Sequence, residues 1–428
     1  MKAIIHIGSP KTGSSTIQQY LDRNRQPLKM QSIFIPSYSG AGHVQLAAMA
    51  VIFGAKISKQ SSFVDCIEKD LPLLVKENKA LSPEDQDRLW KKCRHEIETN
   101  CGQGDLVIFS TERLFQFHAK EVERVKNLLD SLFDDVSIVL YLRRQPEYLI
   151  SSLFNSIWQG KSCTWPPSAL PEYDKAIKRW SIFGKDKIKI RIFDKQKFHD
   201  NDLLSDFAIT CGFSMAGLER VENMNESRLG SAETEFLRLF NSHVPKMLDL
   251  WTRNPDRESV RPVLLSLQSK TDVKPKAFHV NREEARQILE QCREGNDWIA
   301  REYLGREKLF DEDVSMFPEE VASPHGLTLE KCAEITAYLW KDRCGAVREL
   351  QQENRRIAAE RDASNAELQL SSTNLALLQQ KKSIYWHYYR SKVLAMITFG
   401  KKHKGYKEKR NALHEQVRKI RELHRYNR

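Results

Sequence analysis

Near the start of the chain, a lysine stands among hydroxyl-bearing residues directly after an apolar run. The segment reads Gly8-Ser9-Pro10-Lys11-Thr12-Gly13-Ser14-Ser15-Thr16. Glycines let backbone N–H groups converge on one point, and a helix that begins there directs the positive end of its dipole at the same point. Lys11 would add a mobile positive charge. The segment therefore predicts an anion site; the alternative is a tight turn whose Ser and Thr side chains only cap the following helix.

The spacing within this segment departs from that of nucleoside-triphosphate hydrolases, whose loop reads G-x-x-x-x-G-K-[ST]. Gly8 and Gly13 have the required separation, but Ser14 occupies the lysine position and Lys11 lies three residues earlier. No obvious acidic metal ligand follows a predicted strand, so we expect no metal. An ATP-dependent, kinase-like enzyme is therefore kept only as an alternative.

A second group of phosphate-binding residue types follows the apolar run 136–142. Arg144, Pro146 and Ser152 lie at intervals of two and six residues. An arginine fork and a serine hydroxyl can bind one phosphate together, and proline suits the first turn of a helix because no N–H is needed there. The alternative is that Arg143 and Arg144 are surface charges and Ser152 has no particular role.

Together the two segments resemble the donor site of PAPS-dependent sulfotransferases, in particular the bacterial enzymes that act on carbohydrates. PAPS is 3′-phosphoadenosine-5′-phosphosulfate. The similarity covers roughly residues 1–310 and includes a strand and helix around 191–213. The family's Arg-Lys-Gly element is matched only in part by Arg228-Leu229-Gly230, where Leu replaces Lys, so the adenosine contacts stay open.

This resemblance implies roles for individual residues. Lys11 would contact the oxygen that joins phosphate to sulfonate and stabilise the leaving 3′,5′-bisphosphate. Arg144 and Ser152 would bind the 3′-phosphate, while Arg143 would face solvent or the acceptor. The 5′-phosphate would be held by the hydroxyls and amides of Thr12, Gly13, Ser14, Ser15 and Thr16.

Sulfonate transfer to a hydroxyl also needs a base for the acceptor's proton. The apolar run 106–109 leads through Ser110 and Thr111 into Glu112, at the edge where a parallel sheet presents catalytic groups. This stretch resembles the Ser-Ser-Glu stretch of bacterial carbohydrate sulfotransferases. The alternative role of Glu112 is a structural ion pair with Arg113 or Arg144. His43 is the second candidate base; otherwise it is a packed or solvated histidine.

The elements that must position these residues alternate along the chain. Apolar runs predict strands at 3–7, 106–109, 136–142 and 187–193. Helical patterns occur at about 84–99, 119–132 and 146–159, and residues 225–310 read as mainly helical. This alternation predicts an α/β fold with a parallel sheet flanked by helices.

The predicted organisation has four parts: a sulfotransferase domain at 1–310, a linker with a short helix at 311–345, an amphipathic or coiled-coil helix at 346–380, and a basic aromatic tail at 381–428. The third part has apolar residues at six of ten positions spaced by three and four. We therefore expect homo-oligomers through 346–380. The ten positions are Val347, Leu350, Asn354, Ile357, Arg361, Ser364, Leu368, Ser371, Leu375 and Leu378.

The net charge of +11 comes from the tail, because residues 381–428 hold 15 Lys and Arg against 3 Asp and Glu. The rest of the chain is close to neutral and needs no nucleic acid as a partner. Aromatic residues beside an apolar segment and flanking cations predict peripheral membrane contact through 383–428. The alternatives are a basic helix that packs on its own domain or on another copy, and nucleic-acid binding without a recognisable module.

Eight scattered cysteines without a C-x-x-C pair predict a reducing compartment. With no expected signal peptide or membrane span, we expect a cytoplasmic protein that can lie at the inner face of the membrane. The expected acceptor is a hydroxyl or amine of a cell-surface carbohydrate or glycolipid. A non-catalytic nucleotide-binding adaptor is the alternative outside enzymes.

Overall fold

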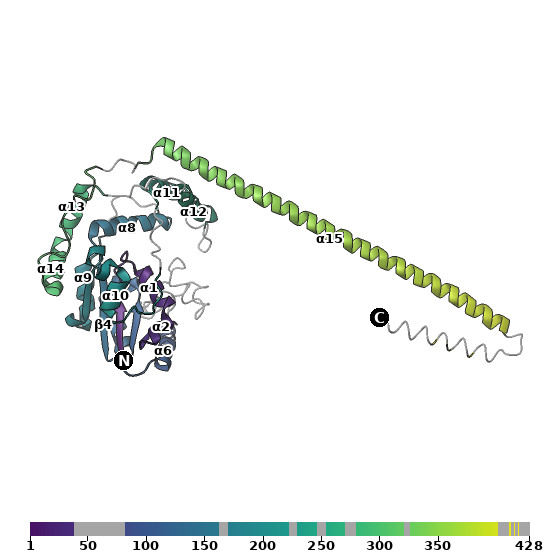
Figure 1. Ribbon diagram of the computed structural model, residues 1–428, viewed down its shortest axis with the longest axis horizontal. Helices are drawn as coiled ribbons and strands as arrows, with labels where there is room; N and C mark the ends of the chain where they lie inside the picture. Colours follow the sequence, from purple (N-terminus) through teal and green to yellow (C-terminus); the bar gives the residue numbers. More distant parts are fainter. Residues whose placement is uncertain are drawn as a thin grey trace. The chain divides into compact units, whose positions relative to one another are not determined.

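The computed structural model describes most of the chain, which divides into two units, Met1–Trp340 and Lys341–Arg428 (Figure 1). The described residues are 1–37, 82–161, 170–221, 229–245, 254–269, 280–320 and 326–400, with 411, 415 and 418 in addition. His43, Cys66, Cys163 and Arg228 therefore lie outside the described residues.

A five-stranded sheet forms the centre of the first unit, in the order β2-β3-β1-β4-β5. All neighbouring strands are parallel, which confirms the predicted fold class. The four strands predicted from apolar runs are present within one residue, whereas β2 was not predicted. The strands are β1 Lys2–His6, β2 Ile33–Phe34, β3 Leu106–Ser110, β4 Asp135–Leu142 and β5 Ile188–Ile192.

Helices cover both faces of this sheet. Consecutive strand residues point to opposite faces, so Ile5 packs in a cluster with α7 and α9, while Ile4 packs in a second cluster with α1 and α10. Before α15 (Leu329–Gly400), the α-helices among the described residues of the first unit are α1 Ser14–Arg23, α2 Arg25–Lys29, α6 Pro83–Asn100, α7 Ala119–Asp130, α8 Gln145–Trp158, α9 Tyr173–Trp180, α10 Leu203–Cys211, α11 Ser231–His243, α12 Pro255–Ser269, α13 Arg282–Gln291 and α14 Arg293–Leu304.

Helix α8 lies over the carboxyl ends of the strands (Figure 1). Its first half packs with α13 through Tyr148 and Leu149. Its second half packs with α11 and α12 through Leu153 and Ile157. Because these helices hold α8 along its whole length, the residues at its start have a defined place above the sheet.

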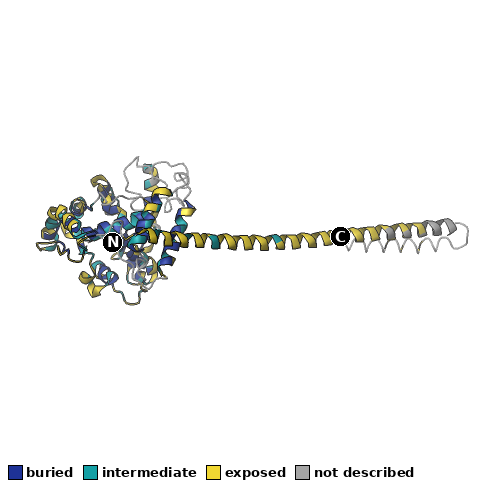
Figure 2. Cartoon of the chain, turned by 90° about the horizontal axis from the view of Figure 1, so that it is seen from above, coloured by how far each residue is buried: buried dark blue, intermediate teal, exposed yellow. Residues whose placement is uncertain are grey.

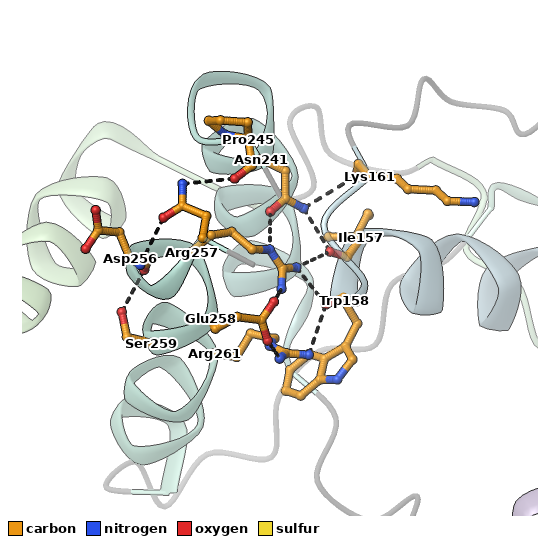
Figure 3. A network of polar contacts seen from close by, with 11 residues as sticks. Ile157, Trp158, Lys161, Asn241, Pro245, Asp256, Arg257, Glu258, Ser259 and Arg261 are labelled. Carbon is orange, nitrogen blue, oxygen red and sulfur yellow. Dashed lines mark hydrogen bonds and ion pairs between the residues drawn. The ribbon is translucent and has the colours of Figure 1, made fainter. Parts of the chain in front are cut away.

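A buried arginine caps the far end of α8 (Figure 3). Arg257 is 0% exposed and donates to the carbonyl oxygens of Ile157 at 3.1 Å and Trp158 at 2.6 Å. Asn241 donates a third hydrogen bond, to the Ile157 oxygen at 2.8 Å. The last carbonyls of a helix have no partner within the helix, so this cluster satisfies them away from water.

The last described helix, α15, runs from Leu329 to Gly400 and has 72 residues. It includes the predicted helix at 346–380, and the divisions at 310, 345 and 380 stay predictions. Most of its described side chains are exposed (Figure 2). Among the helices whose residues are described, none is sufficiently long and apolar to span a membrane.

Candidate functional site

The predicted anion loop connects β1 to α1 and is held along β4. Ser9 donates its N–H to the Tyr141 oxygen at 3.0 Å, and Tyr141 donates its N–H to the Gly8 oxygen at 2.6 Å. The Ser9 hydroxyl also donates to the Tyr141 oxygen, at 2.9 Å. The backbone of one residue in β4 thus fixes the start of the loop.

Two glycines of the loop allow close approaches that another residue would block. Gly13 has a φ of +75°, and a Cβ placed on it would lie 2.4 Å from Cδ2 of Leu203 in α10. Gly8 has a φ of +99°, and its Cβ would lie 3.0 Å from Cβ of Glu112. The left-handed backbone favours glycine at both places, so the loop lies directly against Glu112, which follows β3, and against the first residue of α10.

The start of α1 offers unsatisfied donors. Its N-cap is Gly13, which has no side chain to accept from the first N–H groups. The Ser14 hydroxyl is buried and has no hydrogen-bond partner among the described residues. Because Gly13 cannot cap the helix through a side chain, the simple capping alternative does not account for this turn, and a bound anion would satisfy these donors.

The remaining hydroxyls of the loop differ in their surroundings. Thr12 is 0% exposed and donates from Oγ1 to the Ser9 oxygen at 2.5 Å. Its hydroxyl therefore shapes the loop from within. Thr16 is buried in the first turn of α1, whereas Ser15 is exposed. All five predicted residues from Thr12 to Thr16 lie in the loop and this turn.

Arg143 contacts the loop, although the resemblance places it toward solvent or the acceptor. It is half-buried, donates from Nη1 to the Lys11 oxygen at 3.0 Å, and lies 5.3 Å from the centre of the Phe193 ring. Its own backbone oxygen accepts from the Tyr173 hydroxyl at 2.7 Å. The backbone of Lys11, which has a positive φ of 68°, is thereby fixed from the end of β4.

Arg144 is the N-cap of α8 and is held on several sides. Its Nη1 lies 3.0 Å from Oε1 of Glu147, and its Nη2 donates to the Asp313 oxygen at 2.5 Å. The guanidinium carbon lies 5.7 Å from the centre of the Phe317 ring. The Nε atom is buried without a partner among the described residues. Ser152 lies half-buried two turns further along the same helix.

Glu112 begins a 3₁₀ helix, Glu112–Gln116, with one residue between it and the end of β3. Its Oε2 accepts from Nε2 of Gln18 at 2.8 Å, and the same amide donates to the Ser110 oxygen at 3.3 Å. Gln18 belongs to α1, so the carboxylate is oriented by the helix that follows the anion loop. The carboxylate paired with Arg144 is that of Glu147. The other candidate base, His43, lies outside the described residues.

A buried carboxylate that pairs with Tyr141 of β4 was missed by the sequence patterns. Asp206 is 0% exposed. Its carboxylate accepts hydrogen bonds from the Tyr141 hydroxyl at 2.8 Å and from Nε of Arg191 at 3.0 Å. Burial opposes ionisation of Asp206, but the bonds from Arg191, His199 and Tyr141 outweigh it and lower its pKa. The sequence signal that could have revealed this buried carboxylate is a single Asp within the apolar helix 203–211.

A cavity of about 880 Å³ lies beside this region, between the start of α8, α9 and α14. Tyr173 and Gln145 line it, and Gln145 donates to Oδ1 of Asn296 at 2.7 Å. Lys11, Glu112 and Arg144 are not among its lining residues. Within the described ranges, no group of three or more His, Cys, Asp or Glu side chains could hold a metal ion.

Comparisons with known proteins give distant similarities. No family model matches the chain. An uncharacterised protein of Archaeoglobus fulgidus is 24% identical over 224 residues, which are 51% of this chain and 60% of that protein. The crystal structure of a sulfotransferase from Alicyclobacillus acidocaldarius is 15% identical with a TM-score of 0.31, and the alignment covers 60% of this chain and 98% of that one. The assignment of a parallel α/β sheet therefore rests on the strands of the chain itself.

Proposed function

We propose that this chain is a sulfotransferase that moves a sulfonate group from PAPS to a hydroxyl or amine of an acceptor. One observation carries most of the support: each of the two sequence segments assigned to a phosphate has a buried donor without a partner among the described residues. These donors are the Ser14 hydroxyl and Nε of Arg144. A buried unpaired donor costs free energy unless a ligand accepts from it.

The two segments are neighbours at one edge of the sheet. β1 and β4 are parallel and hydrogen-bonded, with His6 opposite Val139. The loop that follows β1 and the arginines that follow β4 therefore leave the sheet side by side. Parallel α/β sheets bind ligands at this carboxyl edge. Two adjacent anion sites can bind both the 5′-phosphosulfate and the 3′-phosphate of one donor, whereas a single loop would bind only one of these groups.

In the proposed reaction, an acceptor oxygen forms a bond to sulfur as the bond from sulfur to the 5′-phosphate oxygen breaks. The electron pair of that bond leaves with the 3′,5′-bisphosphate. Lys11 would stabilise the charge on the departing oxygen, and Glu112, oriented by Gln18 at 2.8 Å, would take the acceptor's proton. Every proton and charge is then accounted for without a metal.

We also propose a carbohydrate or glycolipid acceptor, which the resemblance to bacterial carbohydrate sulfotransferases supports, and peripheral membrane contact through the basic segment 383–428. Transfer of radiolabelled sulfonate from PAPS to a panel of cell-envelope glycans and lipids would identify the acceptor. If no glycan or lipid of the panel received sulfonate, the proposed acceptor class would be wrong, even if PAPS were the correct donor.

Calorimetry with 3′,5′-bisphosphoadenosine tests the donor. We expect binding, and at least about tenfold weaker binding of 5′-AMP, which lacks the phosphate assigned to Arg144 and Ser152. Equal affinities would exclude the second phosphate site. No binding of either nucleotide, or magnesium-dependent ATP turnover in its place, would overturn the proposal in favour of an adaptor or a kinase-like enzyme.

A further inference from the structure

Helix α15 exposes a regular series of apolar side chains. Six of them are between 51% and 65% exposed: Val347, Leu350, Ile357, Leu368, Leu375 and Leu378. Large apolar side chains that recur on one side of a long helix are unfavourable to leave in water. A long helix with this pattern is stabilised when a second helix covers the series.

The series follows the seven-residue repeat of a coiled coil. Its first core position, conventionally a, falls on Val347, Asn354, Arg361, Leu368 and Leu375. The second, d, falls on Leu350, Ile357, Ser364, Ser371 and Leu378. We call these ten residues the α15 seam. They lie within a single uninterrupted helix, so the repeat forms one continuous stripe.

We propose that the α15 seam pairs with the same seam of a second copy of this chain, parallel and in register. This proposal is independent of the sulfonate chemistry. The first argument is Asn354, an asparagine at an a position between the apolar d residues Leu350 and Ile357. In a parallel pair the two asparagine amides meet and hydrogen-bond, and such a residue selects the register and the two-stranded state.

The second argument is the distribution of charge beside the seam. The g positions are acidic at Glu353, Glu360 and Glu367, whereas the e positions that they would face in a parallel pair are Ala358, Asn365 and Ser372. In an antiparallel pair, g faces g, so these glutamates would face each other. Like charges that face one another are destabilising, so the charge pattern favours the parallel arrangement.

Arg361 adds to the same preference. At an a position of a parallel pair, its side chain lies beside the g residue that precedes it in the other copy, which is Glu360. Four polar residues within the seam lower its stability. We therefore expect association that depends on protein concentration.

The experiment compares two double variants of the full-length chain by light scattering and sedimentation over a range of concentrations. Leu368→Asn with Leu375→Asn changes the seam. Leu370→Asn with Leu377→Asn is the matched control, because these leucines are 65% and 50% exposed but lie outside the seam. Each variant loses the same helix propensity. We expect dimers for the parent and the control, and at least about tenfold weaker association for the seam variant.

A parent chain that stays monomeric at every concentration would overturn the proposal, as would trimers or equal behaviour of the two variants. Orientation is tested by oxidising the Leu378→Cys variant, with Leu377→Cys as the control outside the seam. A parallel pair brings the two introduced sulfurs together and gives a covalent dimer above the background of the parent. Cross-linking only between Val347→Cys and Leu378→Cys chains would show an antiparallel pair and contradict the proposed orientation.

Discussion

Arg143 donates a hydrogen bond from Nη1 to the backbone oxygen of Lys11 at 3.0 Å. The two residues are 132 positions apart in the chain, and the contact joins the end of β4 to the middle of the anion loop. The backbone of the lysine that the proposed reaction needs is therefore fixed by a residue that directly follows β4. Several consequences of this arrangement can be measured.

Replacing Arg143 by Met should loosen the loop while retaining much of the contact with Phe193. A hydrogen bond from a charged donor contributes about 1.5–3 kcal/mol, so we expect at least about tenfold weaker binding of 3′,5′-bisphosphoadenosine by calorimetry. Arg94→Met, a change on α6 in a surface ion pair with Glu98, is the control. Equal affinities of the two variants would show that the contact does not position the loop.

Lys11→Ala should lower the rate of sulfonate transfer by about 10²–10³, because a preorganised charge on the leaving oxygen is lost. Arg144→Ala should instead lower donor affinity, since its assigned phosphate is bound equally before and during transfer. Steady-state kinetics with PAPS separates the two effects, and circular dichroism checks the fold. A Lys11→Ala enzyme with an unchanged kcat would contradict the assigned role.

Glu112→Gln should reduce transfer by about 10²–10⁴ while leaving donor affinity unchanged, because the amide cannot take the acceptor's proton. Gln18→Ala is the companion variant. It keeps the carboxylate but removes the 2.8 Å contact that orients it, so a smaller loss is expected. If Glu112→Gln retains the parental rate, the base is another group, and His43 becomes the first to test.

Arg257→Met should destabilise the first unit by about 3–5 kcal/mol, because buried carbonyl groups and Glu258 lose a charged partner. Thermal and urea unfolding measure this loss. Arg261→Met is the matched control, since Arg261 also contacts Glu258 and the Trp158 oxygen but is 22% exposed. If both variants lost a similar free energy of unfolding, burial of Arg257 would not explain its contribution to stability.

His6 predicts how stability depends on pH. Burial lowers its pKa from 6.5 to about 3, so the folded protein keeps this imidazole neutral. Below pH 6.5 the unfolded chain binds a proton that the folded chain does not, and His6 then costs about 1.4 kcal/mol of stability per pH unit until about pH 3. His6→Gln should remove this slope in urea titrations, whereas His95→Gln, on the exposed face of α6, should not. Parallel pH profiles for the parent and His6→Gln would refute the assignment.

Runs of β-branched residues made the main strands predictable, because each run is long enough to show its character. The two-residue strand Ile33–Phe34 has no period that a sequence could display. The positions of the anion loop after β1 and of Glu112 after β3 followed from short stretches of consecutive residues, whereas their chemical roles stay predictions. The hydrogen bonds from Arg143 to Lys11 and from Tyr141 to Asp206 join residues that are far apart in the sequence, so only the folded structure reveals them.

Strand β4 contacts both halves of the proposed donor site. The backbone of Tyr141 binds the start of the anion loop, and the strand leads directly into Arg143 and Arg144. The two anion sites are therefore separated by a short path of four consecutive residues, which starts at Tyr141 and Leu142 at the buried end of β4 and ends at Arg144. Two anion sites at a fixed separation bind best the nucleotide whose phosphates have that same separation. We therefore expect tighter binding of a nucleotide with a 3′-phosphate than of its 2′-phosphate isomer, although the two carry the same charge.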